Sequence, residues 1–524
     1  MNFSLQLHLT CLILGILGLG LFSDPAVASE GPWQNLNPGS GGRIIGIDLD
    51  ETVPGRAFYS SDMEGIYETR DYGESWHFIG AGLTHGHGFV VKSDPQNPQR
   101  LYCGTLYSLE VSEDNGKHWQ SVRVTEGFTI GHIAVDKNDP KFVYAAVGYR
   151  GRPPEARPHK KMKVYQSTHG DRVVFVSHDA GKTWRKIGFA AGEGWRGCYG
   201  VEVLPDGSVV LAAGDGVYRS SNHGLSWQKL PLPPGQKACW GATVSPDGKW
   251  CYAFFTPAQP GRQGGAKTRL YAASLTQSPC SWQDLGFPRN TAALYTWPAM
   301  DPRSTANEHR LLCSPRSKRD GLYLGHISHA GGKISVRWER ALYWGQGFWG
   351  PPQATAPAFL TSWEQYSPRA LAFTFTPSSW KRPGIWTTTG QMLYSVWTDR
   401  PNWQSTWSNR SSKLVKTWPV KHGLYPVRTW RTRGVQCTYT YMADAFKNYM
   451  IQSQGDNGAL ESWDNGYSWT SQTRPATWRG TNSMCNLIVR DLNPPVVLAH
   501  TSWGFGAGAE EGHLFAKKLI HFDP

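Results

Sequence analysis

The feature that most constrains the fold of this chain is an eight-residue pattern that occurs five times. Each copy reads Ser/Thr-x-Asp/Asn-x-Gly-x-x-Trp, and the copies span residues 69–76, 112–119, 177–184, 220–227 and 462–469. The Asp or Asn offers an oxygen that accepts backbone N–H groups of its own turn, the Gly permits a positive φ, and the Trp packs between neighbouring sheets. We therefore predict a structural role for the residues at the third position, which are Asp71, Asp114, Asp179, Asn222 and Asp464.

Strand-like segments surround the first copy and form a four-stranded unit. Residues 44–49, 56–60, 65–69 and 75–79 are short runs of strand-forming residues separated by turn residues. Similar units begin near residues 87, 131, 200, 242, 297, 370, 436 and 485. The sequence therefore predicts an all-β fold, a single β-propeller of seven to nine four-stranded blades over residues 29–524. We expect the segment Pro32–Leu36 to supply a missing outer strand of the last blade and close the ring.

The first 28 residues resemble a secretory leader. Cys11–Phe22 is an apolar run, and Ala26-Val27-Ala28 is a small-residue cleavage site, so we expect a signal peptide over residues 1–28 and a secreted protein, extracellular or periplasmic. An uncleaved anchor is the alternative, because residues 1–10 carry no Lys or Arg. No later segment approaches the roughly 20 apolar residues of a membrane span. Eight cysteines remain after leader removal, an even number that suits an oxidising compartment.

Charge and composition narrow the partners. The formal net charge of +13 favours polyanionic partners, and in an exported protein an acidic polysaccharide fits better than nucleic acid. The 25 tryptophans supply aromatic rings on which sugars stack. No Cys-x-x-Cys or Cys/His cluster occurs, so we expect neither a metal site nor a cofactor. The sequence sets no oligomeric state.

The blade topology separates two faces of the propeller. The repeated turns join third to fourth strands on one face, whereas second-to-third turns and the connections between blades lie on the other, called here the loop face. Binding sites are commonly built from loops on one rigid face. The candidate substrate-binding residues on the loop face are His85, His87, Trp195, Arg196, Tyr295, Trp363, Glu364, Tyr366 and Arg369.

The five copies resemble the Asp-box (BNR) repeat of sialidases, sortilin ectodomains and glycoside hydrolase family 74, which are β-propellers. The segment Tyr59–Tyr67 is similar to a first-blade segment of family 74 that carries one of two catalytic carboxylates, and this resemblance nominates Asp62. The second acid of that family lies in a Gly-Asp context, and the nearest match is Gly455-Asp456. In that chemistry one carboxylic acid protonates the leaving oxygen and one carboxylate activates water.

Three functions follow from these observations. The first is a glycoside hydrolase that cleaves a polysaccharide or oligosaccharide with Asp62 and Asp456. The second is a polysaccharide lyase for a uronate-containing glycan, in which His85, His87, Tyr295, Tyr366, Arg196 and Arg369 would neutralise the acid and move the proton. The third is a non-catalytic, sortilin-like propeller that binds glycan or peptide.

Overall fold

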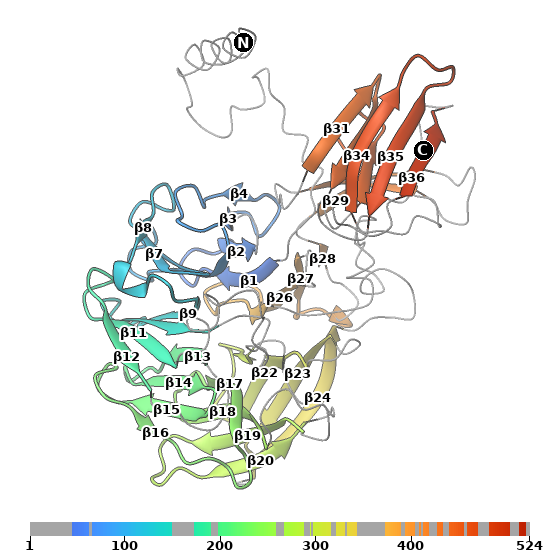
Figure 1. Ribbon diagram of the computed structural model, residues 1–524. Helices are drawn as coiled ribbons and strands as arrows, with labels where there is room; N and C mark the ends of the chain where they lie inside the picture. The colour runs from blue at the N-terminus through green and yellow to red at the C-terminus, as the bar shows by residue number, and fades with distance from the viewer. Residues whose placement is uncertain are drawn as a thin grey trace.

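The computed structural model shows an all-β chain (Figure 1). The described part contains 36 strands and one short 3-10 helix, Arg123–Thr125, and has no α-helix. No helix in this part is long and apolar enough to cross a membrane. The structure describes residues 44–519 except 62–64, 149–171, 190–196, 258–266, 288–293, 295–296, 316–320, 331–332, 343–371, 389–392, 404–407, 410–411, 419–426, 433–439, 455–457, 470–481 and 503–512. The leader and Pro32–Leu36 lie outside these residues.

Seven sheets each contain four antiparallel strands in sequence order, as the four-stranded unit predicts. The first four sheets are β1 (Ile44–Leu49), β2 (Ala57–Ser61), β3 (Gly65–Thr69) and β4 (His77–Phe78); β5 (Gly88–Ser93), β6 (Leu101–Thr105), β7 (Leu109–Ser112) and β8 (Gln120–Ser121); β9 (Ile130–Val135), β10 (Val143–Val147), β11 (Val173–Ser177) and β12 (Arg185–Gly188); β13 (Cys198–Val203), β14 (Val209–Ala213), β15 (Gly216–Ser220) and β16 (Gln228–Lys229). The other three are β17 (Ala238–Val244), β18 (Trp250–Thr256), β19 (Arg269–Ser274) and β20 (Trp282–Gly286); β21 (Ala299–Met300), β22 (Glu308–Cys313), β23 (Leu322–Ser328) and β24 (Ser335–Leu342); β25 (Phe373–Phe375), β26 (Gly384–Thr388), β27 (Leu393–Trp397) and β28 (Ser408–Asn409).

The first strands of these sheets contact one another in a ring. β1 contacts β5, β5 contacts β9, and the series continues through β13, β17, β21 and β25 back to β1. The first and seventh sheets share a buried cluster that includes Tyr59, Trp76 and Trp386. Trp380 Nε1 donates a hydrogen bond of 3.0 Å to the carbonyl of Asp50, across 330 residues of sequence. The first and the seventh sheets are therefore in contact with each other.

The strands after Asn409 form three further sheets, at the upper right of Figure 1. The sequence predicts one propeller up to the C-terminus, whereas the ring of contacts from β1 to β25 is formed by strands that precede these three sheets. Leu460 and Trp469 from these sheets join a buried cluster with residues of β22–β27, which attaches them to the ring. The strands are β29 (Ser412–Trp418) and β30 (Val427–Thr432); β31 (Thr440–Phe446), β32 (Tyr449–Gln454) and β33 (Gly458–Ser462); β34 (Asn482–Val489), β35 (Val496–Ser502) and β36 (His513–Lys518).

The five repeated turns share the same two backbone-to-side-chain hydrogen bonds. In the first, the Asp71 carboxylate accepts Ser75 N–H at 2.9 Å and Ser75 Oγ–H at 2.6 Å, while Gly73 N–H donates to Thr69 Oγ1 at 2.9 Å. Asn222 accepts Ser226 N–H at 2.9 Å in the fourth turn, so an amide performs the same task. Both the Gly and the residue before it have positive φ, for example 83° at Gly73 and 60° at Tyr72. Each turn is therefore closed by its own side chains.

The repeated turns also pack on neighbouring sheets. Tyr102 of β6 donates its hydroxyl to the carbonyl of Ala180 in the third turn at 3.0 Å. Trp119 of the second turn donates Nε1–H to the carbonyl of Ile79, which follows β4, at 2.8 Å. Because these bonds cross between adjacent sheets, the repeat stabilises the stacking of sheets as well as the turn itself.

A second recurring turn, absent from the predictions, joins first and second strands. Asp50 Oδ1 accepts the N–H groups of Thr52 and Val53, and Asp94 Oδ1 accepts those of Gln96 and Asn97. In both turns an arginine six residues later pairs with the aspartate, at 2.9 Å for Arg56 and 3.1 Å for Arg100. Arg56 is almost completely buried and also pairs with Glu68 at 2.6 Å. These ion pairs fix the ends of the inner strands.

Candidate functional site

The loop face of the first three sheets is a hydrogen-bonded ridge. Each second-to-third turn is joined through backbone groups to the segment that enters the next sheet. The bonds run from Gly65 N–H to Gly86 O (2.5 Å), Leu106 N–H to His87 O (3.0 Å), Gly127 N–H to Tyr107 O (2.6 Å) and Gly148 N–H to Thr129 O (3.0 Å). Because backbone bonds of this kind restrict loop motion, side chains on the ridge are held on a rigid support.

His85 and His87 lie on this ridge, within the connection between the first two sheets. The backbone N–H of His87 donates to His85 Nδ1 at 3.1 Å, and the two rings are 6.3 Å apart. The His85 ring meets the Tyr107 ring edge to face at 4.7 Å, while the His87 ring packs on Phe89. Burial lowers the pKa of His85 below its usual value, so this imidazole is neutral at pH 7.

Asp62 and Asp456 fall in the same turn of two different sheets. Ser61 and Gly65 form the last pair of β2 and β3, and Asp62 belongs to the residues between them. Gln454 and Gly458 form the last pair of β32 and β33, and Asp456 belongs to the residues between those. The two aspartates themselves lie outside the described residues. The strand pairs on either side show only that each aspartate comes, in sequence, between a second and a third strand.

The remaining predicted substrate-binding residues are not described by the structure. They are Trp195, Arg196, Tyr295, Trp363, Glu364, Tyr366 and Arg369. Their grouping with His85 and His87 stays a prediction.

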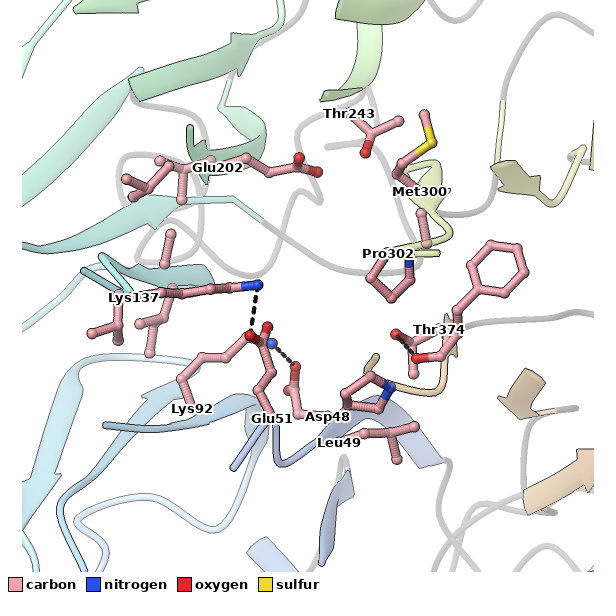
Figure 2. Close-up of a pocket in the computed structure, with 18 of the residues that line it drawn as sticks. Asp48, Leu49, Glu51, Lys92, Lys137, Glu202, Thr243, Met300, Pro302 and Thr374 are labelled. Carbon is pink, nitrogen blue, oxygen red and sulfur yellow. Dashed lines mark hydrogen bonds and ion pairs between the residues drawn. The ribbon is translucent and has the colours of Figure 1, made fainter. Parts of the chain in front are cut away.

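The cavity found in the described part is the central channel of the ring, with a volume of about 560 Å³ (Figure 2). It is lined by the ends of the seven first strands and by the turns that follow them, such as Glu51 and Lys137. Those turns share a face with the five repeated turns, because first-to-second and third-to-fourth turns lie at the same end of an antiparallel sheet. The channel is thus on the side opposite the ridge.

Two ion pairs join charged side chains that line the channel. Lys92 Nζ lies 2.6 Å from Asp48 Oδ1, and Lys137 Nζ lies 2.6 Å from Glu51 Oε2 (Figure 2). Asp48 also accepts a backbone N–H from the next inner strand, that of Val91, at 3.1 Å. The contacts of Asp48 join the first two sheets, whereas the pair of Lys137 with Glu51 joins the third sheet to the first.

Glu202 projects into the channel from β13 (Figure 2). It accepts the N–H of Val244 on the next inner strand at 3.1 Å. Burial raises its pKa to about 7, against the opposing effects of the Val244 hydrogen bond, Lys137 and Lys92. A carboxylate with this pKa is common at functional sites, but here it joins two inner strands as Asp48 does.

Sequence reasoning missed these channel residues, although a signal was present. Asp48 and Glu202 interrupt otherwise apolar first strands two residues after a Gly, in Gly-Ile-Asp-Leu and Gly-Val-Glu-Val. It also missed Tyr107 and Glu110, which lie at the turn of the second sheet equivalent to the Asp62 turn. The segment Thr105–Glu110 is polar within an apolar hairpin, and that contrast was the available sign.

The described cysteines and metal-binding groups supply no further chemistry. Cys103, Cys198, Cys239, Cys251, Cys280 and Cys313 are free thiols, so these six form no disulfide framework. Cys198 is buried, and burial raises the pKa of its thiol to about 12. Within the ranges the structure covers, no group of three or more His, Cys, Asp or Glu side chains is arranged to hold a metal ion.

The fold and the ridge define a class of protein, an all-β chain of propeller-type sheets that carries a rigid loop face. The chain is similar to a crystal structure of an ancestral GH74 enzyme, with a TM-score of 0.79 and 30% identity over 94% of this chain and 62% of that one. The Niastella koreensis GH74 enzyme (TM-score 0.57, 15% identity, 91% and 67% of the two chains) and the Xanthomonas campestris GH74 xyloglucanase (0.51, 16%, 91% and 74%) share the fold.

Two curated proteins match by sequence, and this chain spans less than a third of either. An oligoxyloglucan-reducing end-specific xyloglucanase of Emericella nidulans is 25% identical over 256 residues, which are 45% of this chain and 30% of that protein. The vacuolar protein sorting/targeting protein 10 of Mycosarcoma maydis is 26% identical over 256 residues, 46% of this chain and 14% of that protein. No known protein-family profile matches the chain.

Proposed function

We propose that this chain is a secreted glycoside hydrolase that cleaves a polysaccharide, with xyloglucan as the first substrate to test. The observation that carries the proposal is the 30% identity with the ancestral GH74 enzyme over nearly the whole chain. The name of the Emericella nidulans relative supports the choice of xyloglucan. We propose residues 1–28 as its leader and residues 29–524 as the functional chain.

In the proposed architecture, the seven four-stranded sheets are the blades of one closed propeller and the sheets after Asn409 belong to a second group of blades. The contact of β25 with β1 supports the closure. Leu460 and Trp469 pack with residues of the sixth and seventh sheets, and the seventh sheet packs on the sheet that carries Asp62. This chain of contacts supports a cleft to which the Asp62 and Asp456 turns both contribute.

The proposed chemistry assigns the acid and base roles to Asp62 and Asp456. One carboxylic acid protonates the glycosidic oxygen as the bond breaks, and the other carboxylate takes part in the attack on the anomeric carbon. The equivalent position of the two turns, each at the loop end of a second and third strand, supports this pairing. Asp48 and Glu51 of the central channel are less suitable, because each already pairs with a lysine.

The test measures turnover on a panel of neutral and acidic polysaccharides, by new reducing ends and by ultraviolet absorbance of unsaturated products. We expect reducing ends from xyloglucan without unsaturated product, and a loss of at least about 100-fold in turnover for Asp62→Asn and for Asp456→Asn. Asp139→Asn is the matched control, because Asp139 is a half-buried turn aspartate that pairs with Lys141 on the opposite face. Near-normal turnover of both Asp62→Asn and Asp456→Asn would refute the assignment, and unsaturated product would indicate a lyase.

A binding function is the second candidate. The match to the Mycosarcoma maydis sorting protein is as strong as the match to the xyloglucanase, at 26% identity over the same length. Binding of a polysaccharide or peptide without any cleavage of the panel would support it over the hydrolase.

A further inference from the structure

A pair of aromatic rings lies on the ridge beside the Asp62 turn. Tyr107 comes from the turn between β6 and β7, and His85 comes from the connection between the first two sheets. Their ring centroids are 4.7 Å apart with an angle of 83° between the planes, and both side chains are half-buried. Half-exposed aromatic pairs of this kind offer apolar surface together with polar edges.

Backbone hydrogen bonds connect this pair to the Asp62 turn. Gly65, the first residue after that turn, donates its N–H to Gly86, the neighbour of His85 in sequence. Leu106 beside Tyr107 in turn donates to the carbonyl of His87. The pair is therefore fixed relative to the strands that carry Asp62.

The buried carboxylate of Glu110 connects the segment that carries Tyr107 with the segment that carries His85. Glu110 on β7 is completely buried, and its Oε1 accepts the hydroxyl of Ser108 at 2.6 Å and the hydroxyl of Thr84. Ser108 follows Tyr107 in sequence, and Thr84 precedes His85. A carboxylate that accepts from both neighbours holds the two rings in one relative position, so Glu110 is a positioning residue.

The pair is uncharged at neutral pH. Nδ1 of His85 accepts a hydrogen bond and so carries no proton, and burial lowers the pKa of the ring. A uronate would need a cation at this place, whereas neutral sugar hydroxyls need only ring surface and neutral donors or acceptors.

We propose that Tyr107 and His85 form a binding platform for a neutral sugar residue of the polysaccharide chain, next to the Asp62 turn. This inference rests on the proposed carbohydrate function and assigns one sugar-binding position of that function to Tyr107 and His85. It departs from the expectation of an acidic partner, which came from the net charge of the whole chain. The local site, and not the total charge, sets what a subsite accepts.

The experiment compares binding of the full-length protein to xyloglucan and to polygalacturonate by affinity gel electrophoresis. We expect Tyr107→Ala to weaken xyloglucan binding at least tenfold, and Tyr107→Phe, which keeps the ring, to change it less than threefold. Tyr467→Ala removes an exposed tyrosine from the fifth Asp-box turn and is the matched control. We expect wild type to bind polygalacturonate more weakly than xyloglucan.

The outcomes separate the platform from the hydrolase proposal. Wild-type affinity in Tyr107→Ala, or tighter binding of polygalacturonate than of xyloglucan, would overturn the platform even if hydrolysis is observed. Binding that depends on Tyr107 without hydrolysis would support the platform and overturn the hydrolase. If Tyr107→Ala does not fold, as judged by its melting temperature, His85→Gln decides, and wild-type affinity in that variant overturns the proposal.

Discussion

Glu202 gives a pH dependence of stability that can be worked out from the structure. Its carboxyl group lies in the channel between β13 and β17, and burial raises its pKa to about 7 from the ordinary 4.5. When the chain unfolds, this group returns to its ordinary pKa. Between pH 4.5 and 7 the unfolded chain has therefore lost a proton that the folded protein keeps, and the free energy of unfolding falls as pH rises.

The size of the effect follows from the two pKa values. At about 1.4 kcal/mol for each tenfold change in the ionisation equilibrium, the rise from 4.5 to about 7 corresponds to roughly 3 kcal/mol at full effect. Because the channel admits water, we expect about half of this. With an unfolding entropy of about 2.1 cal/mol/K per residue over the roughly 370 residues of the ring, the melting temperature changes by about 2 °C at half effect and by about 4 °C at full effect.

The variant Glu202→Gln isolates this contribution, because glutamine resembles the protonated acid at every pH. We expect wild type and variant to melt at nearly the same temperature at pH 4.5, and the variant to melt about 2–4 °C higher than wild type at pH 7.5. Differential scanning fluorimetry of both proteins across this range provides the difference. A difference in melting temperature that stays constant between pH 4.5 and 7.5 would refute the reasoning.

Two further substitutions test the contacts that hold the sheets. Asp71→Ala removes the acceptor of three hydrogen bonds in the first Asp-box turn and should cost about 1–2 kcal/mol in unfolding free energy, whereas Asp71→Asn should cost less than about 0.5 kcal/mol, because Asn222 makes the equivalent bonds in the fourth turn; equal losses in chemical unfolding would contradict this. Arg56→Met leaves the Asp50 carboxylate buried without its cation, leaves Glu68 with the half-exposed Arg70 alone, and should cost about 3–5 kcal/mol. Loss of the exposed pair of Arg269 with Asp284 in Arg269→Met should cost less than about 1 kcal/mol. Similar costs for the two arginines, measured by the same unfolding assay, would show that burial does not decide the value of these pairs.

The local structure of the sheets was largely predictable from sequence. The predicted strands at 44–49, 56–60 and 65–69 match β1, β2 and β3 to within one residue. The reason is that the Asp-box turn is determined by residues within eight positions of one another. Its hydrogen bonds need no information from the rest of the chain.

The ring closure could not be read in the same way. It depends on contacts such as Trp380 with Asp50, which lie 330 residues apart and have no local pattern. Counting strand-like units in the sequence could not show that the units after Asn409 form a separate group of sheets. The strand and turn residues of these units resemble those of the earlier sheets. Only the contact of β25 with β1 separates the two groups.

The two candidate aspartates belong to the strand units of the fold, but they lie outside the eight-residue motif that recurs in the sequence. In the sheets that carry a repeated turn, the turn between the second and third strands lies at the opposite end of the sheet. The repeated turn is closed by its own side chains, as in the bonds of Asp71 and Thr69. Asp62 and Asp456 come between a second and a third strand in two separate groups of sheets, and Tyr107 does so in the second sheet. A site assembled from such turns needs sheets that are already rigid, and the hydrogen-bonded ridge from Gly65 to Gly148 supplies that rigidity before any ligand binds.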